Sequence, residues 1–193
     1  MSPTNNTLIN TVKYYLKKIL PTLCSSFRLF AACLFPFCNE GIWPWLIIGA
    51  GLSDLVDGWL ARRWQVVSWQ GGLVDAIADK CFVLTVLIVF IVRGKFSPVW
   101  FPLVIARDIV VLVTALYITA LRLWSAFKKM DPRVTGKIAT GGQFTLYLLV
   151  ALYQEATLPA LLFASACSLI AAVDYARVFY LALEERAREG NAR

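Results

Sequence analysis

Hydrophobic and polar positions alternate in long blocks along the chain, with apolar tracts separated by short polar segments. A helix needs about 20 mostly apolar residues to cross a hydrocarbon core of ~30 Å. Six tracts approach that length, and we expect each of them to form a transmembrane helix. The tracts are Leu23–Cys38, Trp43–Leu60, Gly72–Val92, Val99–Trp124, Ile138–Tyr153 and Ala160–Leu183.

The segment before the first tract, "NTLINTVKYYLKKILP", has a different pattern. Its aliphatic residues fall near one helical face and its lysines fall largely off that face, which predicts an amphipathic helix lying in the membrane interface. The predicted fold class is therefore an all-α integral membrane protein with six transmembrane helices. The expected organisation is an interfacial helix over 1–21, a six-helix membrane domain over 22–185 and a C-terminal tail over 186–193.

Composition agrees with a membrane protein, since 59% of the 193 residues are hydrophobic and only 16% are charged. Lys and Arg gather in the segments that lie on one side if the N-terminus is cytoplasmic, which leaves Arg93 and Lys95 opposite. The net charge of +7 would then face anionic membrane lipids, so nucleic acid is not an expected partner. The chain has no histidine, which excludes histidine-based catalysis.

Four aspartates stand out inside these apolar tracts. Asp54 and Asp57 lie three apart near the end of the second tract, and Asp75 and Asp79 lie four apart at the start of the third. Each pair lines one helical face, and an antiparallel hairpin would bring the pairs face to face. Four neighbouring carboxylates need a compensating cation. Oxygen ligands without Cys or His favour Mg²⁺, Mn²⁺ or Ca²⁺, and four carboxylates suit two ions.

Other interpretations of the aspartates stay open. They could form a static ion network with Arg62, Arg63 and Lys80 at the membrane surface, or the chain could be a cation transporter or a scaffold. Carboxylates near the membrane midplane would favour transport. Here they lie near one face and accompany Gly58 and Ala61 at fixed spacing, which favours an enzyme.

A longer pattern contains these residues. The string "DLVDGWLAR", eight further residues and then "GGLVDAIAD" resembles the motif DxxDGxxARx8GxxxDxxxD of the CDP-alcohol phosphatidyltransferase family. The segments "LPTLCSSFRL", "IARDIV" and "GKIATGGQ" resemble the family's first, fourth and fifth helices. The resemblance covers residues from about 20 to 155.

The resemblance implies transfer of a phosphatidyl group from CDP-diacylglycerol to an alcohol, with release of CMP and use of Mg²⁺ or Mn²⁺. It implies that Asp54, Asp57 and Asp75 ligate the metal ions, and that Asp79 is the catalytic general base and also touches a metal. It further implies that Gly58, Ala61 and Arg62 lie along the cytidine diphosphate.

Two further residues are candidates for nucleotide binding. Gly71 removes a side chain where phosphates or a second helix would approach closely. Arg28 lies inside the first tract, where a guanidinium must reach the interface or find an anionic partner such as a nucleotide phosphate.

The acceptor alcohol is less well specified. Arg107, Arg133 and Lys137 could bind a phosphate together, which favours glycerol 3-phosphate, although Arg133 and Lys137 could equally be positive-inside anchors. Phosphatidylglycerol, the acceptor of a cardiolipin synthase, is the alternative, because the residues after Arg107 depart from the synthase-like pattern.

Asp108, Asp174 and Arg177 have no assigned catalytic role. Adjacent helical residues do not face each other, so we do not expect Arg107 and Asp108 to form an ion pair with each other. Two alternatives stay open: each residue bonds a different neighbouring helix, or Arg107 points into a polar cavity. Asp174 and Arg177, three apart in the sixth tract, are expected to form an ion pair.

A bacterial or mitochondrial inner membrane is the expected location, with the active site facing the cytoplasm or its equivalent, and a homodimer is left open.

Overall fold

The computed structural model describes residues 25–64, 69–120, 134–153 and 157–191, without the side chains of residues 57–64, 69–76, 119 and 185–191. The expected interfacial helix over 1–21 lies outside this part of the chain. All the regular structure in the described residues is helical. The chain divides into two compact units, Met1–Arg93 and Gly94–Arg193.

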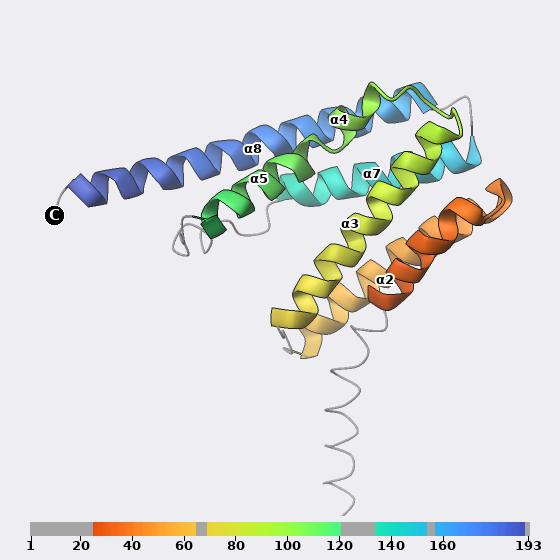
Figure 1. Ribbon diagram of the computed structural model, residues 1–193, viewed down its shortest axis with the longest axis horizontal. Helices are drawn as coiled ribbons and strands as arrows, with labels where there is room; N and C mark the ends of the chain where they lie inside the picture. The colour runs from red at the N-terminus through yellow and green to blue at the C-terminus, as the bar shows by residue number, and fades with distance from the viewer. Residues whose placement is uncertain (1–24, 65–68, 121–133, 154–156, 192–193) are drawn as a thin grey trace, which may run out of the picture. The chain divides into compact units, whose positions relative to one another are not determined.

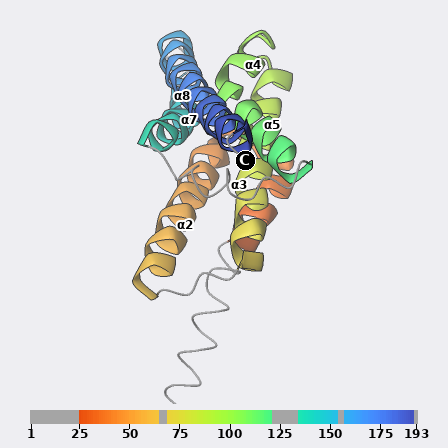
Figure 2. The same cartoon turned by 90° about the vertical axis from the view of Figure 1, so that its left-hand side faces the viewer.

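The first unit contains the first three expected spans. Residues 25–34 are helical and continue into a short 3-10 helix, η1 (Phe35–Phe37). A second 3-10 helix, η2 (Glu40–Ile42), leads into α2 (Trp43–Trp64). Helix α3 (Trp69–Val92) ends just before Gly94, whose φ of 71° is a conformation that glycine adopts without strain. Figure 2 shows α2 and α3 running in opposite directions, as expected for a hairpin.

A cluster of buried aromatic rings joins the helices of the first unit. The Phe35 ring stacks on Trp43 with centroids 5.4 Å apart, and it forms T-shaped contacts with Phe82 and Phe90 of α3. All four side chains are at most 1% exposed. Because these rings belong to η1, α2 and α3, their packing fixes how those three elements meet.

The second unit is built along α8 (Thr157–Asn191), which packs against α4 (Trp100–Val104), α5 (Ala106–Ala120) and α7 (Val134–Leu152) (Figure 1). Small buried residues allow this close packing. A Cβ added to Gly142 of α7 would lie 3.7 Å from the Ala164 Cα of α8. The small buried residues of α8 recur at helical spacing and include Ala160, Ala164, Ser168, Ala171 and Ala172.

The expected fourth span is not one helix. The chain breaks at Ile105, with φ −99° and ψ 9°, so the prediction of a continuous helix over Val99–Trp124 was wrong. The carbonyl of Val104 at this break accepts a hydrogen bond from the buried side-chain amide of Gln143. The apolar tract alone does not show that a side-chain amide replaces the backbone N–H that would normally donate to this carbonyl.

The other expected spans correspond to single helices with shifted ends. Helix α7 begins four residues before the expected start at Ile138, and α8 continues to Asn191. Most of the segment 186–193, expected as a tail, is therefore helical.

Within the described residues, one helix is both long and apolar enough to cross a membrane. It covers Thr157–Glu184, 28 residues that include an 18-residue window with a mean hydropathy of 1.7, and Ser25–Phe37 is apolar but shorter. Many large apolar side chains are also exposed, including Phe30, Phe37, Val92, Ile170 and Val173. Such extensive apolar exposure fits a protein surrounded by lipid better than one surrounded by water.

Candidate active site

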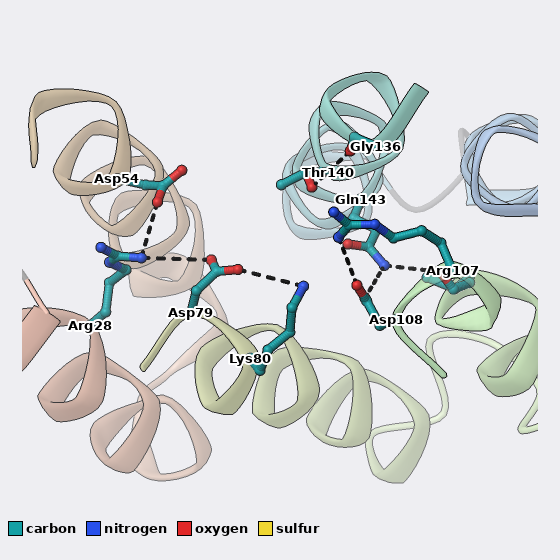
Figure 3. Close-up of polar contacts among 10 residues, drawn as sticks. Arg28, Asp54, Asp79, Lys80, Arg107, Asp108, Gly136, Thr140 and Gln143 are labelled. Atoms are coloured by element: carbon teal, nitrogen blue, oxygen red, sulfur yellow. Dashed lines mark hydrogen bonds and ion pairs between the residues drawn. The ribbon is translucent and has the colours of Figure 1, made fainter. Parts of the chain in front are cut away.

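The guanidinium of Arg28 joins two of the four predicted aspartates. Its Nη1 lies 3.0 Å from Asp54 Oδ1 of α2 and 3.8 Å from Asp79 Oδ1 of α3 (Figure 3). The Arg28 side chain is 0% exposed, so its charge depends on anionic neighbours for compensation. Carboxylates from two helices therefore converge on one buried cation, and the hairpin does bring Asp54 and Asp79 to the same place.

Asp79 is the more buried of these two carboxylates, with 16% of its side chain exposed against 39% for Asp54. Its Oδ2 lies 3.6 Å from the Lys80 ammonium. Its Oδ1 is buried and accepts no hydrogen bond from any residue that the structure describes. Buried carboxylate oxygens are normally satisfied, so this oxygen is a candidate to contact a metal ion or a substrate hydroxyl.

The donor set suits a hard divalent cation. Asp54 and Asp79 offer carboxylate oxygens, and no histidine or close cysteine pair competes for a softer metal. Two carboxylates are fewer than a complete site needs, and the described side chains contain no group of three potential metal ligands. The predicted ligands Asp57 and Asp75 belong to α2 and α3, where the structure describes their backbone but not their side chains.

The nucleotide-binding candidates are described only in part. Gly58, Ala61 and Arg62 belong to α2 and Gly71 belongs to α3, and only the backbone of these four is described. The sequence suggested a nucleotide phosphate as the anionic partner of Arg28, whereas the structure shows Asp54 and Asp79 beside it. Of the static ion network considered as an alternative, the described side chains show the contact between Lys80 and Asp79. The sequence did contain a signal for these contacts. Arg28 lies in the first apolar tract and the aspartates lie in the next two, so an ion pair between the tracts could have been expected.

The second unit has a polar group of its own around the start of α5. Arg107 Nη1 lies 2.8 Å from Asp108 Oδ1, so the prediction that these neighbours do not form an ion pair with each other was wrong (Figure 3). Both residues lie in the first turn of α5, where the long arginine side chain can fold back toward its neighbour. The amide of Gln143 donates to the other oxygen, Asp108 Oδ2, at 3.1 Å.

The guanidinium of Arg107 is confined between α7 and α8. It lies over the Tyr175 ring, 5.6 Å from the ring centroid to Cζ. A Cβ at Gly136 would lie 3.2 Å from Arg107 Nη2 and 2.7 Å from the Tyr175 hydroxyl, so a larger residue would displace both side chains.

The other acceptor-binding candidates lie near this group in the chain. Lys137 follows Gly136 directly and is exposed, whereas Arg133 lies outside the described residues. Asp174 of α8, expected to pair with Arg177, accepts a hydrogen bond of 2.7 Å from Thr135 of α7. Sequence reasoning missed the contacts of Gln143, although the segment "GKIATGGQ" had marked its position.

Comparison with known proteins places these residues in a family. Residues 18–173 match the family described as CDP-alcohol phosphatidyltransferase. The chain belongs to this family. CDP-alcohol phosphatidyltransferases are membrane-embedded enzymes that use a divalent metal. The match includes the aspartate motif, Arg28 and the Arg107–Asp108–Gln143 group.

Relatives within the family bear two different names. A "Cardiolipin synthase (CMP-forming)" of Streptomyces coelicolor is 40% identical over 73 residues, 37% of this chain and 34% of that protein. A "CDP-diacylglycerol--glycerol-3-phosphate 3-phosphatidyltransferase" of Mycoplasma pneumoniae is 42% identical over 65 residues, 34% of this chain and 29% of that protein. A protein of the same name from Pectobacterium atrosepticum is 32% identical over 139 residues, 64% of this chain and 71% of that protein. The matched region thus spans about a third of the first two relatives and more of the third.

Replacement of Arg28 tests whether the two carboxylates depend on its charge. Arg28→Leu should lower the free energy of unfolding by about 3 kcal/mol, because it leaves the buried Oδ1 of Asp79 without the neighbouring guanidinium. Arg28→Leu combined with Asp54→Asn should recover part of that loss. Unfolding in mixed micelles measures both effects, with the exposed Arg177→Leu as control. Wild-type stability in Arg28→Leu would contradict the assigned ion pairs.

Proposed function

We propose that this protein transfers a phosphatidyl group from CDP-diacylglycerol to an alcohol and releases CMP. The observation that carries the proposal is the convergence of Asp54 and Asp79 on Arg28, within the aspartate motif of a CDP-alcohol phosphatidyltransferase. A transfer at phosphorus needs a base for the acceptor hydroxyl and positive charge near the phosphates. The motif supplies candidates for both.

Asp79 is the proposed general base. The chain has no histidine, and the buried Oδ1 of Asp79 accepts no hydrogen bond from the described residues. This oxygen would accept the proton of the acceptor hydroxyl. The acceptor oxygen would then form a bond to the phosphatidyl phosphorus while the bond from that phosphorus to CMP breaks. Arg28 would keep the Asp79 carboxylate in position throughout.

Asp54, Asp57 and Asp75 would hold the divalent ions, Mg²⁺ or Mn²⁺, with Asp79 as a further ligand. When bound, these ions supply positive charge that offsets the charge of the pyrophosphate and of the CMP leaving group. Gly58, Ala61, Arg62 and Gly71 would lie along the cytidine diphosphate, with Arg28 near its phosphates.

Glycerol 3-phosphate is the proposed acceptor. A phosphate dianion is best bound by several cations, and a guanidinium can give it two parallel hydrogen bonds. Arg107 is held beside Gly136, the residue directly before Lys137, and Arg133 precedes that helix. Two of the relatives compared above are named for glycerol 3-phosphate.

Phosphatidylglycerol is the second candidate acceptor, because the Streptomyces relative is named a cardiolipin synthase. With either acceptor, the proposed location is a bacterial or mitochondrial inner membrane, with the site facing the cytoplasm or its equivalent. Homodimer formation remains compatible with this proposal.

Product identification tests the reaction and the acceptor together. Purified protein with CDP-diacylglycerol, Mn²⁺ and glycerol 3-phosphate should release CMP and form phosphatidylglycerophosphate. EDTA should abolish turnover and Mg²⁺ or Mn²⁺ should restore it, because the ligand set consists of oxygen. Turnover in the metal-free protein would contradict the metal assignment. Conversion of phosphatidylglycerol but not glycerol 3-phosphate would transfer the assignment to cardiolipin synthesis.

Neutralising the proposed phosphate-binding cations should affect the acceptor selectively. Arg133→Gln or Lys137→Gln should raise the KM for glycerol 3-phosphate roughly tenfold or more, because each removes a charge-assisted contact. The KM for CDP-diacylglycerol should change by less than about twofold. Lys95→Gln, on the expected opposite side, is the control. Normal acceptor kinetics in both variants would leave these residues as topological anchors.

A further inference from the structure

The amide of Gln143 bridges two acceptors at the break between α4 and α5. Its Nε2 donates to the Val104 carbonyl at 2.9 Å and to Asp108 Oδ2 at 3.1 Å (Figure 3). Gln143 is 1% exposed. An amide nitrogen carries two hydrogens, so a single buried group can make both of these bonds.

The break creates the need for this amide. In a continuous α-helix, the carbonyl of residue 104 accepts from the backbone N–H of residue 108. Here the helix is interrupted at Ile105, and a buried carbonyl at such a point needs another donor. Gln143 donates to that carbonyl, while the Ser168 hydroxyl of α8 accepts from the backbone N–H of Arg107 at 3.1 Å.

The bond to Asp108 extends the effect of Gln143 to Arg107. One carboxylate oxygen of Asp108 accepts from Gln143, and the other lies 2.8 Å from Arg107 Nη1. Asp108 is 12% exposed and Arg107 is 16% exposed, so solvent screens this arrangement only weakly. The guanidinium then has one preferred place, over Tyr175 and against Gly136.

Arg107 retains a donor for a ligand. Its Nε is buried and has no hydrogen-bond partner among the residues that the structure describes. Such a donor is costly to leave unsatisfied, and an anionic oxygen would satisfy it with a charge-assisted bond. The orientation of the guanidinium would therefore determine how well an anionic acceptor binds.

We propose that Gln143 is a positioning residue for the acceptor, acting through Asp108 on Arg107. This inference rests on the proposed function, in which Arg107 binds the phosphate group of the acceptor alcohol. Gln143 itself touches no substrate. Its amide satisfies the Val104 carbonyl at the α4–α5 break. It also keeps the Asp108 carboxylate in the position that orients the Arg107 guanidinium.

Steady-state kinetics of Gln143→Leu tests this role, because leucine approximates the size of glutamine and lacks the amide. The KM for the acceptor should rise at least about tenfold, while kcat and the KM for CDP-diacylglycerol change by less than about threefold. Thr145→Val on the same helix is the matched control. Thr145 is exposed and its hydroxyl donates to the Gly141 carbonyl of its own helix, so acceptor KM should stay unchanged.

A double-mutant cycle separates positioning from a general structural effect. If Gln143 acts through Arg107, Gln143→Leu should raise the acceptor KM by less than about twofold in an Arg107→Gln background. Asp108→Asn, which keeps the size of the side chain, provides a second route if Gln143→Leu does not fold. It should also raise the acceptor KM at least about tenfold.

The outcomes distinguish this inference from the proposed function. Active wild-type protein with an unchanged acceptor KM in Gln143→Leu, or in Asp108→Asn if the first variant does not fold, would overturn the positioning role alone. Independent, multiplicative effects of Gln143→Leu and Arg107→Gln would also overturn it. Wild-type protein that releases no CMP from CDP-diacylglycerol with any acceptor would overturn the proposed function and, with it, this inference.

Discussion

The fully buried guanidinium of Arg28 is the constraint on which the proposed active site depends. A cation removed from solvent is costly unless anions lie close to it. Asp54 and Asp79 meet that requirement from two different helices, so the carboxylates are held by the same interaction that neutralises the arginine. Seven residues further along the chain, about 10 Å in a helix, Phe35 begins the aromatic cluster that packs the same elements together. Polar and aromatic contacts thus join the same three segments, residues 25–37, α2 and α3, at two different positions along the first of them.

A related constraint operates at the α4–α5 break. The interruption leaves a buried carbonyl, and the Gln143 amide satisfies it while holding Asp108 and, through it, Arg107. In both places a buried side chain on another helix fixes a charged group, Arg28 by direct contact with Asp54 and Asp79, and Gln143 through Asp108 on Arg107. Such preorganisation reduces the reorganisation needed when a charged substrate binds.

Much of this arrangement could be predicted from the sequence. Apolar tracts gave the approximate positions of the helices, because a membrane-spanning helix has a characteristic length and composition. The spacing of the aspartates predicted that Asp54 and Asp79 would come together across a hairpin, since both spacings place side chains on one helical face. The fixed motif also indicated the family to which the chain belongs.

Other features depend on tertiary contacts that a linear pattern does not contain. The break at Ile105 lies within an unbroken apolar tract, and only the contact with Gln143 explains how its carbonyl is satisfied. The rule that neighbouring helical residues do not face each other failed for Arg107 and Asp108, because a long side chain in a first helical turn can fold back. The partners of Arg28 could not be predicted, because the sequence does not show which residues of α2 and α3 lie beside it in the folded protein.

The proposed mechanism requires that carboxylates from α2 and α3 form one divalent-cation site. Manganese binding to the purified protein, followed by electron paramagnetic resonance, tests whether they do. Asp54→Asn and Asp79→Asn should each lower Mn²⁺ affinity by about tenfold or more, because each removes a carboxylate ligand. Unchanged Mn²⁺ affinity in both folded variants would contradict it.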